Sequence, residues 1–476
     1  ITSASLYLES GQGVWEIATT SASSGANNQF SESLVFRTYN SEQENSGDTT
    51  TWSGNGTYTE ALRLDKRGTA GFGIPSINAY RYPQQVQVSG SINVIQGRTI
   101  DINAGTFHDS DGINGIYFNN QKMIYVSGSG ANTSIFFGNS AGGTNAATGG
   151  EANIGFGYQS AMAMTTGDYN TLVGYNTGKA LTTGGANVFV GKSAGLKTIA
   201  GDANIGIGTS AFYNSTNADY NVAIGHEAMK TGVTTGADNI AIGRVSLEDT
   251  TTGHHNISIG HKASLNLTTA DNNIAIGEDA LGLGIVTGDK NIAIGTDAGL
   301  DMTSGTGNVL MGITAGASLL AGSYNVALGI GALDASEAAS NQVAIGSNAM
   351  GVGVVTGGTN VAIGANALAD ITAGFSNVAL GTGAAEELTS GYQNVAIGTS
   401  AMGTGIVTGH YNIALGIQSL DDTTSGNDNI ALGRLAAGNL TTGQSNIAVG
   451  SGSMGLGTVT SHDNIAIGNF ALEDNT

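Results

Sequence analysis

The side chains of this chain that could carry out chemistry are carboxylates and histidines that recur at equivalent places. Acidic residues return at one expected corner, as Glu248-Asp249, Asp301, Asp370, Glu386-Glu387, Asp421-Asp422 and Glu473-Asp474. Glycoside hydrolysis needs two carboxyl groups at one defined separation. A catalytic pair would be singular, whereas these acids are distributed along the chain. The pattern therefore indicates a solvated outer edge, with a weak cation site as the alternative.

Histidines give no clearer sign of a reactive centre. Three of them fall at equivalent corners, but on separate repeats, and no His-x-His pair is present: His254, His410 and His462. We interpret them as exposed turn residues, with a metal site as the alternative. The sequence also lacks a phosphate loop, a Ser/His/Asp arrangement and a dinucleotide fingerprint. We expect no enzymatic activity, no catalytic residue, no cofactor and no metal.

Composition excludes several classes of protein. The 476 residues include 76 Gly but only 2 Pro and no Cys, and they lack the Gly-X-Y period of collagen. Hydrophobic residues make up 40% and charged residues 11%, which argues against disorder. The 36 acidic against 15 basic residues argue against binding to nucleic acid or to an anionic membrane. No apolar run approaches the roughly 18 residues of a membrane span, so we expect no membrane insertion.

A short repeat must position the corner residues. From about residue 134 the chain repeats an Asn, an aliphatic residue, a small residue, an aliphatic residue and a Gly, as in residues 221–225 and 239–243. Ser134 and Gln342 replace the Asn in two repeats. The asparagines form one column of equivalent positions: Asn153, Asn170, Asn187, Asn204, Asn221, Asn239, Asn256, Asn273, Asn291, Asn308, Asn325, Asn360, Asn377, Asn394, Asn412, Asn429, Asn446 and Asn464.

The spacing of this column predicts the fold. Successive asparagines are mostly 17 residues apart and sometimes 18, with longer repeats returning about every third one. Several Gly residues per repeat argue against helices, since each costs about 1 kcal/mol in a helix interior. One repeat is too short to bury its own apolar face, so neighbours must stack on it. We predict an all-β fold: a parallel β-solenoid of about twenty rungs, with the Asn amides bonding to the rungs above and below.

Alternation along the strand gives the two faces of each rung different characters. In Ile-Ala-Ile the aliphatic side chains share one face and the small residue lies on the other. We expect the aliphatic pair to fill the core and the small residue to face outward. That position is apolar or small throughout, with Phe136, Leu172, Phe189 and Leu310 as its large members. We infer that a neighbouring chain packs against it at a symmetry axis, which Ala293→Arg would test.

The leading segment has a different pattern. Short alternating strands are expected at residues 5–8, 14–17, 34–37, 62–65 and 86–88, with a polar, turn-rich loop over 41–58. We divide the chain into a small β-rich region over 1–130 and a solenoid over 131–476, with a boundary near 128–130.

Several motifs resemble those of known families. Residues 62–65 (LRLD), 71–75 (GFGIP) and 86–92 (VQVSGSI) resemble a linker common in phage tail fibres, and the strands at 14–17 and 34–37 are similar to those preceding it there. The rungs at 170–176 and 187–191 also look like fibre repeats. The Asn-Ile-Ala-Ile-Gly core is similar to the head repeats of trimeric autotransporter adhesins, whose repeats are shorter. Both resemblances imply homotrimers that attach to surfaces.

These expectations together describe an extracellular structural protein. We expect a virion appendage, a trimeric rod that attaches to a host cell-surface receptor or glycan and joins other virion proteins. The alternative is the passenger region of a bacterial trimeric surface adhesin or filament. A glycan-cleaving tailspike is a third, less favoured alternative, because the acids form no singular pair.

Overall fold

The computed structural model describes two compact units, Ile1–Ala104 and Gly105–Thr476. It describes the strand backbone at 5–10, 13–20, 33–39, 58–65, 70–71, 115–118 and 121–127, and residues 133–143, 150–232, 234–404, 408–455 and 460–473. All regular elements of these residues are strands.

The first unit contains a five-stranded antiparallel sheet in chain order. Its strands are β1 (Ser5–Ser10), β2 (Gly13–Thr20), β3 (Ser33–Tyr39), β4 (Tyr58–Asp65) and β5 (Ala70–Gly71). Four of the strands expected from the sequence lie inside β1 to β4. The strand expected at 86–88 and nearly all of the loop expected at 41–58 lie outside the described residues.

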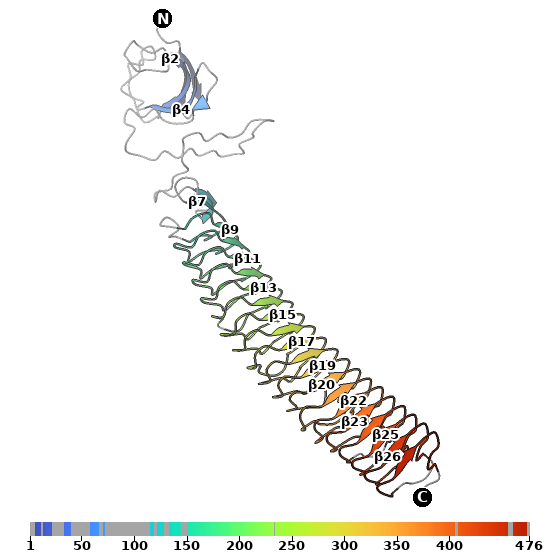
Figure 1. Cartoon of the computed structure of the whole chain (residues 1–476). Helices are drawn as coiled ribbons and strands as arrows, with labels where there is room; N and C mark the ends of the chain where they lie inside the picture. The colour runs from blue at the N-terminus through green and yellow to red at the C-terminus, as the bar shows by residue number, and fades with distance from the viewer. Residues whose placement is uncertain are drawn as a thin grey trace. The chain divides into compact units, whose positions relative to one another are not determined.

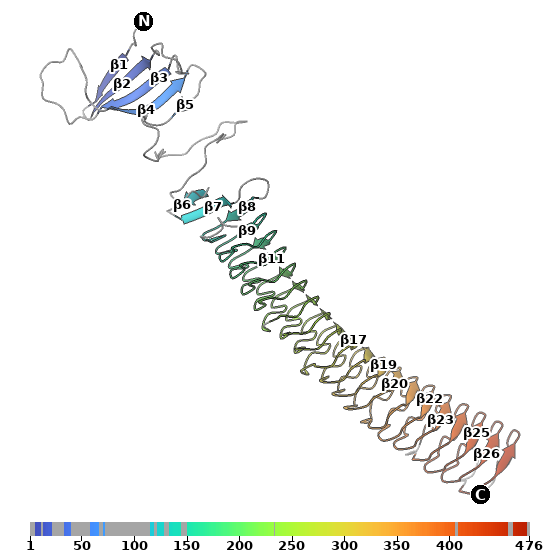
Figure 2. The same cartoon turned by 60° about the vertical axis from the view of Figure 1, so that its left-hand side comes forward.

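The second unit is the predicted parallel β-solenoid, with about 19 turns roughly 17 residues apart (Figures 1 and 2). An antiparallel hairpin, β6 (Gly115–Phe118) and β7 (Gln121–Ser127), precedes it and pairs with β8 (Ser134–Phe137). The expected boundary near 128–130 thus falls between two strands that pair with each other. Parallel pairing then joins β8 to three-residue strands: β9 (Ile154–Phe156), β10 (Thr171–Val173), β11 (Val188–Val190), β12 (Ile205–Ile207), β13 (Val222–Ile224), β14 (Ile240–Ile242), β15 (Ile257–Ile259), β16 (Ile274–Ile276), β17 (Ile292–Ile294), β18 (Val309–Met311), β19 (Val326–Leu328), β20 (Val343–Ile345), β21 (Val361–Ile363), β22 (Val378–Leu380), β23 (Val395–Ile397), β24 (Ile413–Leu415), β25 (Ile430–Leu432), β26 (Ile447–Val449) and β27 (Ile465–Ile467).

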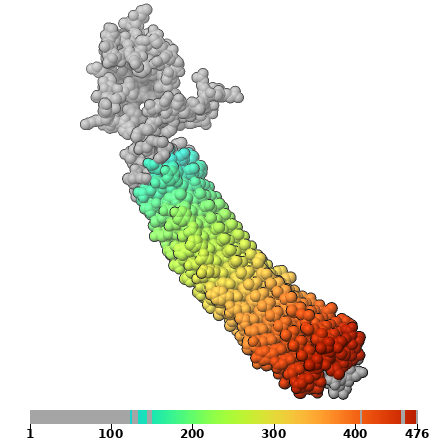
Figure 3. Space-filling view, viewed as in Figure 1, coloured from blue at the N-terminus to red at the C-terminus, as the bar shows by residue number. Residues whose placement is uncertain are grey.

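Each residue of a strand pairs with its equivalent on the next rung. Ala223 of β13 lies opposite Ala241 of β14, and Ile224 lies opposite Ile242. The backbone hydrogen bonds run along the axis, for example from the Val222 N–H to the Asn239 carbonyl at 2.8 Å. With about 4.8 Å between neighbouring strands, nineteen rungs make a rod about 90 Å long. Figure 3 shows its rungs packed into one continuous surface.

The direction of the strand side chains is opposite to the one expected from the sequence. The middle residue of each strand points into the chain's own core, and Ala223, Ala293 and Ala396 are all buried. The two flanking aliphatic residues point outward and stay partly exposed, as in β13 and β14. The small middle residues therefore give no evidence for a neighbouring chain. They are small because the core of a 17-residue rung is thin and already holds side chains such as Met229.

Glycine compensates where the middle residue is large. A Cβ added at Gly206, on the next rung, would lie 2.8 Å from the Phe189 ring, and one at Gly195 would lie 2.3 Å from it. Leu310 likewise packs closely against Gly299 and Gly316. The large core residues thus fit because the adjacent positions have no side chain, which is packing of complementary sizes within one chain.

A glycine follows each strand from β8 to β27 for a different reason. Gly225 has φ of 138°, and a Cβ there would lie 2.3 Å from the Gly243 carbonyl oxygen of the next rung. Only glycine allows both this backbone conformation and this close approach. Three other residues of the same rung, Tyr220, Glu227 and Met229, have left-handed φ of 50–60° and turn the chain at its corners. Ala228 and Met229 are buried, as expected for the second core segment.

Candidate functional site

The asparagine column is a buried hydrogen-bond ladder. The backbone N–H and the side-chain Nδ2 of Asn256 both donate to Oδ1 of Asn239 on the preceding rung, each at 3.0 Å. Nδ2 of Asn256 also donates to the Ala270 carbonyl at 2.8 Å, and its Oδ1 accepts the Asn273 N–H at 2.9 Å. Each amide therefore supplies donors and an acceptor at one place, which holds three segments of the rod together. Its role is structural.

The two exceptions in this column preserve parts of the same pattern. The Gln342 N–H donates to Asn325 Oδ1, and Gln342 Oε1 accepts the Asn360 N–H at 3.1 Å. At the first rung, the Ser134 hydroxyl accepts the Asn153 N–H at 2.9 Å and donates to the Gly150 carbonyl. The position therefore requires an acceptor for the next rung's backbone, which amides of two lengths and, at the first rung, a hydroxyl provide.

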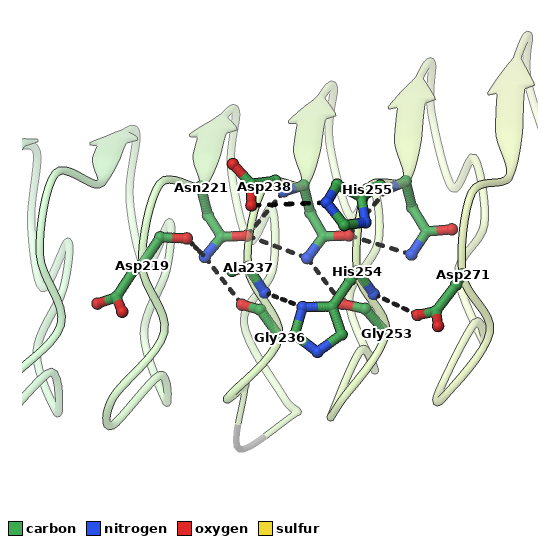
Figure 4. Close-up of polar contacts among 11 residues, drawn as sticks. Asp219, Asn221, Gly236, Ala237, Asp238, Gly253, His254, His255 and Asp271 are labelled. Carbon is green, nitrogen blue, oxygen red and sulfur yellow. Dashed lines mark hydrogen bonds and ion pairs between the residues drawn. The ribbon is translucent and has the colours of Figure 1, made fainter.

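A second column of side chains, many of them polar, lies two residues before the asparagines. Here the side chain accepts a hydrogen bond from the backbone N–H of the preceding rung, as Figure 4 shows for His254 and Asp271. The Ala237 N–H donates to His254 Nδ1 at 2.9 Å, and the His254 N–H donates to Asp271 Oδ1 at 2.7 Å. We call this the acceptor column. Unlike the asparagine ladder, it lies at a partly exposed corner.

The acceptor column uses several kinds of side chain. Asp occurs at 168, 202, 219, 271 and 289, Ser at 323 and 340, Asn at 427, and His at 254, 410 and 462, and each accepts a backbone N–H of the rung before. The spacing of the three histidines in the sequence places them at equivalent corners but does not reveal this role. The detectable signal was the recurrence of Asp two residues before Asn. Burial lowers the pKa of His410, which favours the neutral ring that this bond needs.

One group of possible metal ligands occurs within the described part of the chain. His261, Glu278 and Asp279 lie on two neighbouring rungs, with one ligand atom of each within 4.8 Å of the others. His261 Nδ1 lies 3.1 Å from Glu278 Oε1, while Nε2 contacts the Arg244 guanidinium. An arginine can only donate, so Nε2 accepts and Nδ1 carries the proton toward Glu278. Both ring nitrogens are therefore engaged, and the group forms a chain of charged contacts across three rungs.

At the recurring acidic corner, burial raises the pKa of two carboxyl groups at equivalent positions, Asp334 and Asp421. Asp421 is partly buried, and burial raises its pKa, with the neighbouring Asp422 charge acting in the same direction. Asp421 and Asp422 are adjacent in sequence, and their carboxylates accept hydrogen bonds from Gln418 Nε2 at 3.4 Å and from Thr404 Oγ1 at 2.9 Å.

A run of aromatic side chains interrupts the acceptor column near its C-terminal end. The rings of Phe375 and Tyr392 stack with centroids 4.8 Å apart, and Tyr392 stacks on His410 at 3.7 Å. Tyr411 meets Tyr392 edge-on at 5.3 Å. A hydrogen bond with Tyr411 raises the pKa of Tyr392. Phe375 and Tyr411 remain 44% and 49% exposed, which is high for large apolar rings.

The outward face of the strands is a continuous apolar strip. It consists of the first and third residues of β9 to β27, nearly all of them Ile, Val, Leu or Met. None of the 36 acidic or 15 basic residues occupies these positions. Exposed fractions within the strip include 36% for Ile242 and Ile259 and 46% for Leu415. We call this surface the strand face.

The fold and these columns define the chain as a parallel β-solenoid repeat protein. Comparisons with protein-family models, with curated proteins and with solved structures gave no match. In the part of the chain that the structure describes, no helix is long and apolar enough to cross a membrane.

Proposed function

We propose that this chain is a non-enzymatic fibre protein, a virion appendage that forms a homotrimeric rod and attaches to the surface of a host cell. The observation that carries the proposal is the strand face, an uncharged apolar strip along a long, otherwise acidic solenoid. The motifs similar to those of phage tail fibres support the same assignment. The interface differs from the one expected from the sequence, since the contact surface is the aliphatic pair rather than the small residue between.

The size of the strand face supports an interface rather than a solvated surface. A strip about 90 Å long and about 7 Å wide covers on the order of 600 Å². Monomeric proteins rarely expose a larger contiguous apolar patch, and a stable interface buries about 800 Å² on each partner. Burying the strip would remove this surface from water without burying any charge.

The repeat of the strand face supports further copies of the same chain as its partner. Its side chains recur with the spacing of the rungs, so a parallel, in-register copy presents the same spacing along the whole rod. Identical chains usually bury such a surface by assembling with closed cyclic symmetry. None of the charged residues lies on the strand face, so repulsion between like charges of two copies acts on other surfaces and leaves the strand faces to meet.

The mass in solution tests this assembly. Light scattering on the intact chain should give three times the 47.6 kDa of one chain. The double variant Ile242→Lys with Ile259→Lys should give monomers, because it places two charges inside the interface. Ile285→Lys is the matched control, because Ile285 is 63% exposed at a corner away from the strands. A monomeric wild type, or a trimer unaffected by the double variant, would contradict the proposal.

The location on an appendage needs a separate experiment. Antibodies raised against residues 150–473 should label fibres on particles by immunogold electron microscopy. Labelling of the bacterial surface would instead favour the second candidate, the passenger region of a trimeric adhesin or filament. The Asn-Ile-Ala-Ile-Gly core favours that candidate, and a coding sequence that continues into a coiled coil and a membrane anchor would support it.

A further inference from the structure

The aromatic run at residues 375–411 begins at a gap in the acceptor column. On the preceding rung the equivalent position is Gly358, and a Cβ built there would meet only the Ser340 carbonyl oxygen, at 3.8 Å. Phe375 stacks on Tyr392 with an interplanar angle of 5°, so one ring face is covered. The other side of the ring is directed toward the rung of Gly358, which has no side chain. The 44% exposure of Phe375 agrees with one open ring face.

Polar groups belong to the residues next to this open face. In most of the acceptor column a side chain of the next rung binds the backbone N–H, but Phe375 has no acceptor atom to offer to Gly358. Within the described residues, the Gly358 N–H has no hydrogen-bond partner. On the adjacent column the hydroxyl groups of Thr359 and Ser376 lie 3.2 Å apart, and both residues are exposed. An apolar plane thus lies beside one free donor and two hydroxyl groups.

We propose that the step at Gly358 binds one pyranose ring of a neutral glycan. One face of a pyranose carries C–H groups of partial positive charge, which the negative face of an aromatic ring attracts. The sugar hydroxyl groups can accept the Gly358 N–H and donate to the oxygens of Thr359 and Ser376, because the Thr359 hydroxyl itself donates to the Gly358 carbonyl at 2.7 Å. A few placed polar groups beside an apolar surface are the usual way to orient a small ligand. This inference rests on the proposed attachment function and names its ligand class.

The charge of the protein selects against other ring-shaped ligands. The chain has a net charge of −21, and Asp428 lies close enough to Tyr392 to act on it electrostatically. Nucleotides and sialylated or sulfated sugars carry negative charge that this field repels. A neutral sugar is not repelled and can still stack on the open face of the Phe375 ring.

A printed array of neutral and acidic oligosaccharides, probed with the fluorescently labelled full chain, should give signal on neutral glycans. Calorimetry with the best free oligosaccharide then compares variants. Phe375→Ala should weaken binding roughly 2- to 12-fold, the loss expected for one aromatic contact. Gly358→Phe should weaken it at least as much, because the new ring takes the place of the sugar. Tyr324→Ala is the control: Tyr324 is 65% exposed on another part of the rod, and its loss should change nothing.

The Gly358→Phe variant keeps the test independent of folding. Gly358 lies outside the left-handed region, and its Cβ would make only an ordinary contact, so the rung can accept the ring. The absence of signal on neutral glycans, or equal affinity of both variants and the wild type, would overturn the inference. So would preferential binding of adenosine, tested by NMR titration. A trimer that binds no neutral glycan overturns this site alone, whereas a monomer with Phe375-dependent binding overturns the assembly alone.

Discussion

The asparagine ladder and the acceptor column perform similar tasks in different surroundings. Both connect neighbouring rungs by binding a backbone N–H with a side-chain atom. The asparagines from Asn153 to Asn446 are almost completely buried, with exposed fractions of 0–1%. Only Asn464, on the rung of β27, is partly exposed. The acceptor column lies at a partly exposed corner, where Asp, Ser, His, Asn and aromatic residues all occur.

The difference shows how burial determines which residues a repeat can tolerate. In the ladder, a side chain must donate and accept at once, because water cannot reach a group left without a partner. In the acceptor column, water can replace a missing acceptor, so Gly358 and Phe375 are permitted. The corner can therefore change its chemistry without loss of the fold, which is why we place the candidate ligand site there.

Removing one amide from the ladder should have the largest effect. Asn256→Leu leaves the Asn273 N–H without an acceptor and the Ala270 carbonyl without its Nδ2 donor, both buried. At about 1–3 kcal/mol for each unsatisfied group, the free energy of unfolding should fall by about 2–6 kcal/mol. Chemical denaturation measures the total, and hydrogen exchange of the Asn273 amide measures the local loss.

Asn256→Gln is the matched variant for this experiment. Gln342 already occupies the same column and supplies both the acceptor and a donor to the Gly357 carbonyl at 2.6 Å. Most of the stability should therefore return with Gln. If Leu were tolerated as well as Gln, the amide would not be what connects the rungs, and the contrast between the two columns would fail.

The sequence predicted the fold because its repeat is strict. A column of Asn at intervals of 17 or 18 residues, followed by a strand pattern and Gly, permits only stacked rungs. The asparagines lie in one column, as their spacing indicated. In the first unit the strands at 5–8 and 14–17 lie inside β1 and β2, because alternation of apolar and polar residues is typical of strands.

The sequence could not show which face of each strand is the inner one. Alternation shows that Ala293 lies on one face of the strand and that Ile292 and Ile294 lie on the other. It does not show which of these two faces points into the core. The greater hydrophobicity of isoleucine predicted that the isoleucines would fill the core. The rung is too narrow for them, because residues such as Leu281 already occupy its core, and so the small Ala293 points inward. Ala293→Arg would therefore place a charge in the chain's own core and disrupt its folding, so it does not test assembly.

The acceptor column should be far less sensitive to the loss of one side chain. Asp271→Ala removes the carboxylate that binds the His254 N–H at 2.7 Å, but this N–H is only partly buried. Water can take the vacated place, so the loss should stay below about 1 kcal/mol. Chemical denaturation beside Asn256→Leu gives the comparison directly. Losses of equal size would show that burial does not distinguish the columns.

The smallest effect should be a dependence on pH that arises at His410. Its Nδ1 accepts the Tyr392 N–H at 3.3 Å, and a protonated ring could not accept there. Burial places the pKa of His410 below its ordinary value of 6.5. Above pH 6.5 both folded and unfolded chains hold the neutral ring, and His410 does not affect stability. As the pH falls below 6.5 the unfolded chain takes up the proton first, so stability falls until the folded ring is protonated too.

His410→Asn isolates this contribution. Asn427 on the next rung shows that an amide fits the acceptor column, where its Oδ1 accepts the His410 N–H at 2.7 Å. The variant keeps an acceptor but cannot titrate, so its stability should fall less between pH 7.5 and 5.5 than that of the wild type. Partly buried carboxyl groups such as Asp421 are common to both proteins and cancel in the difference. Identical pH profiles would mean that the ring contributes no more than a replaceable surface contact, which would sharpen the contrast with the buried ladder.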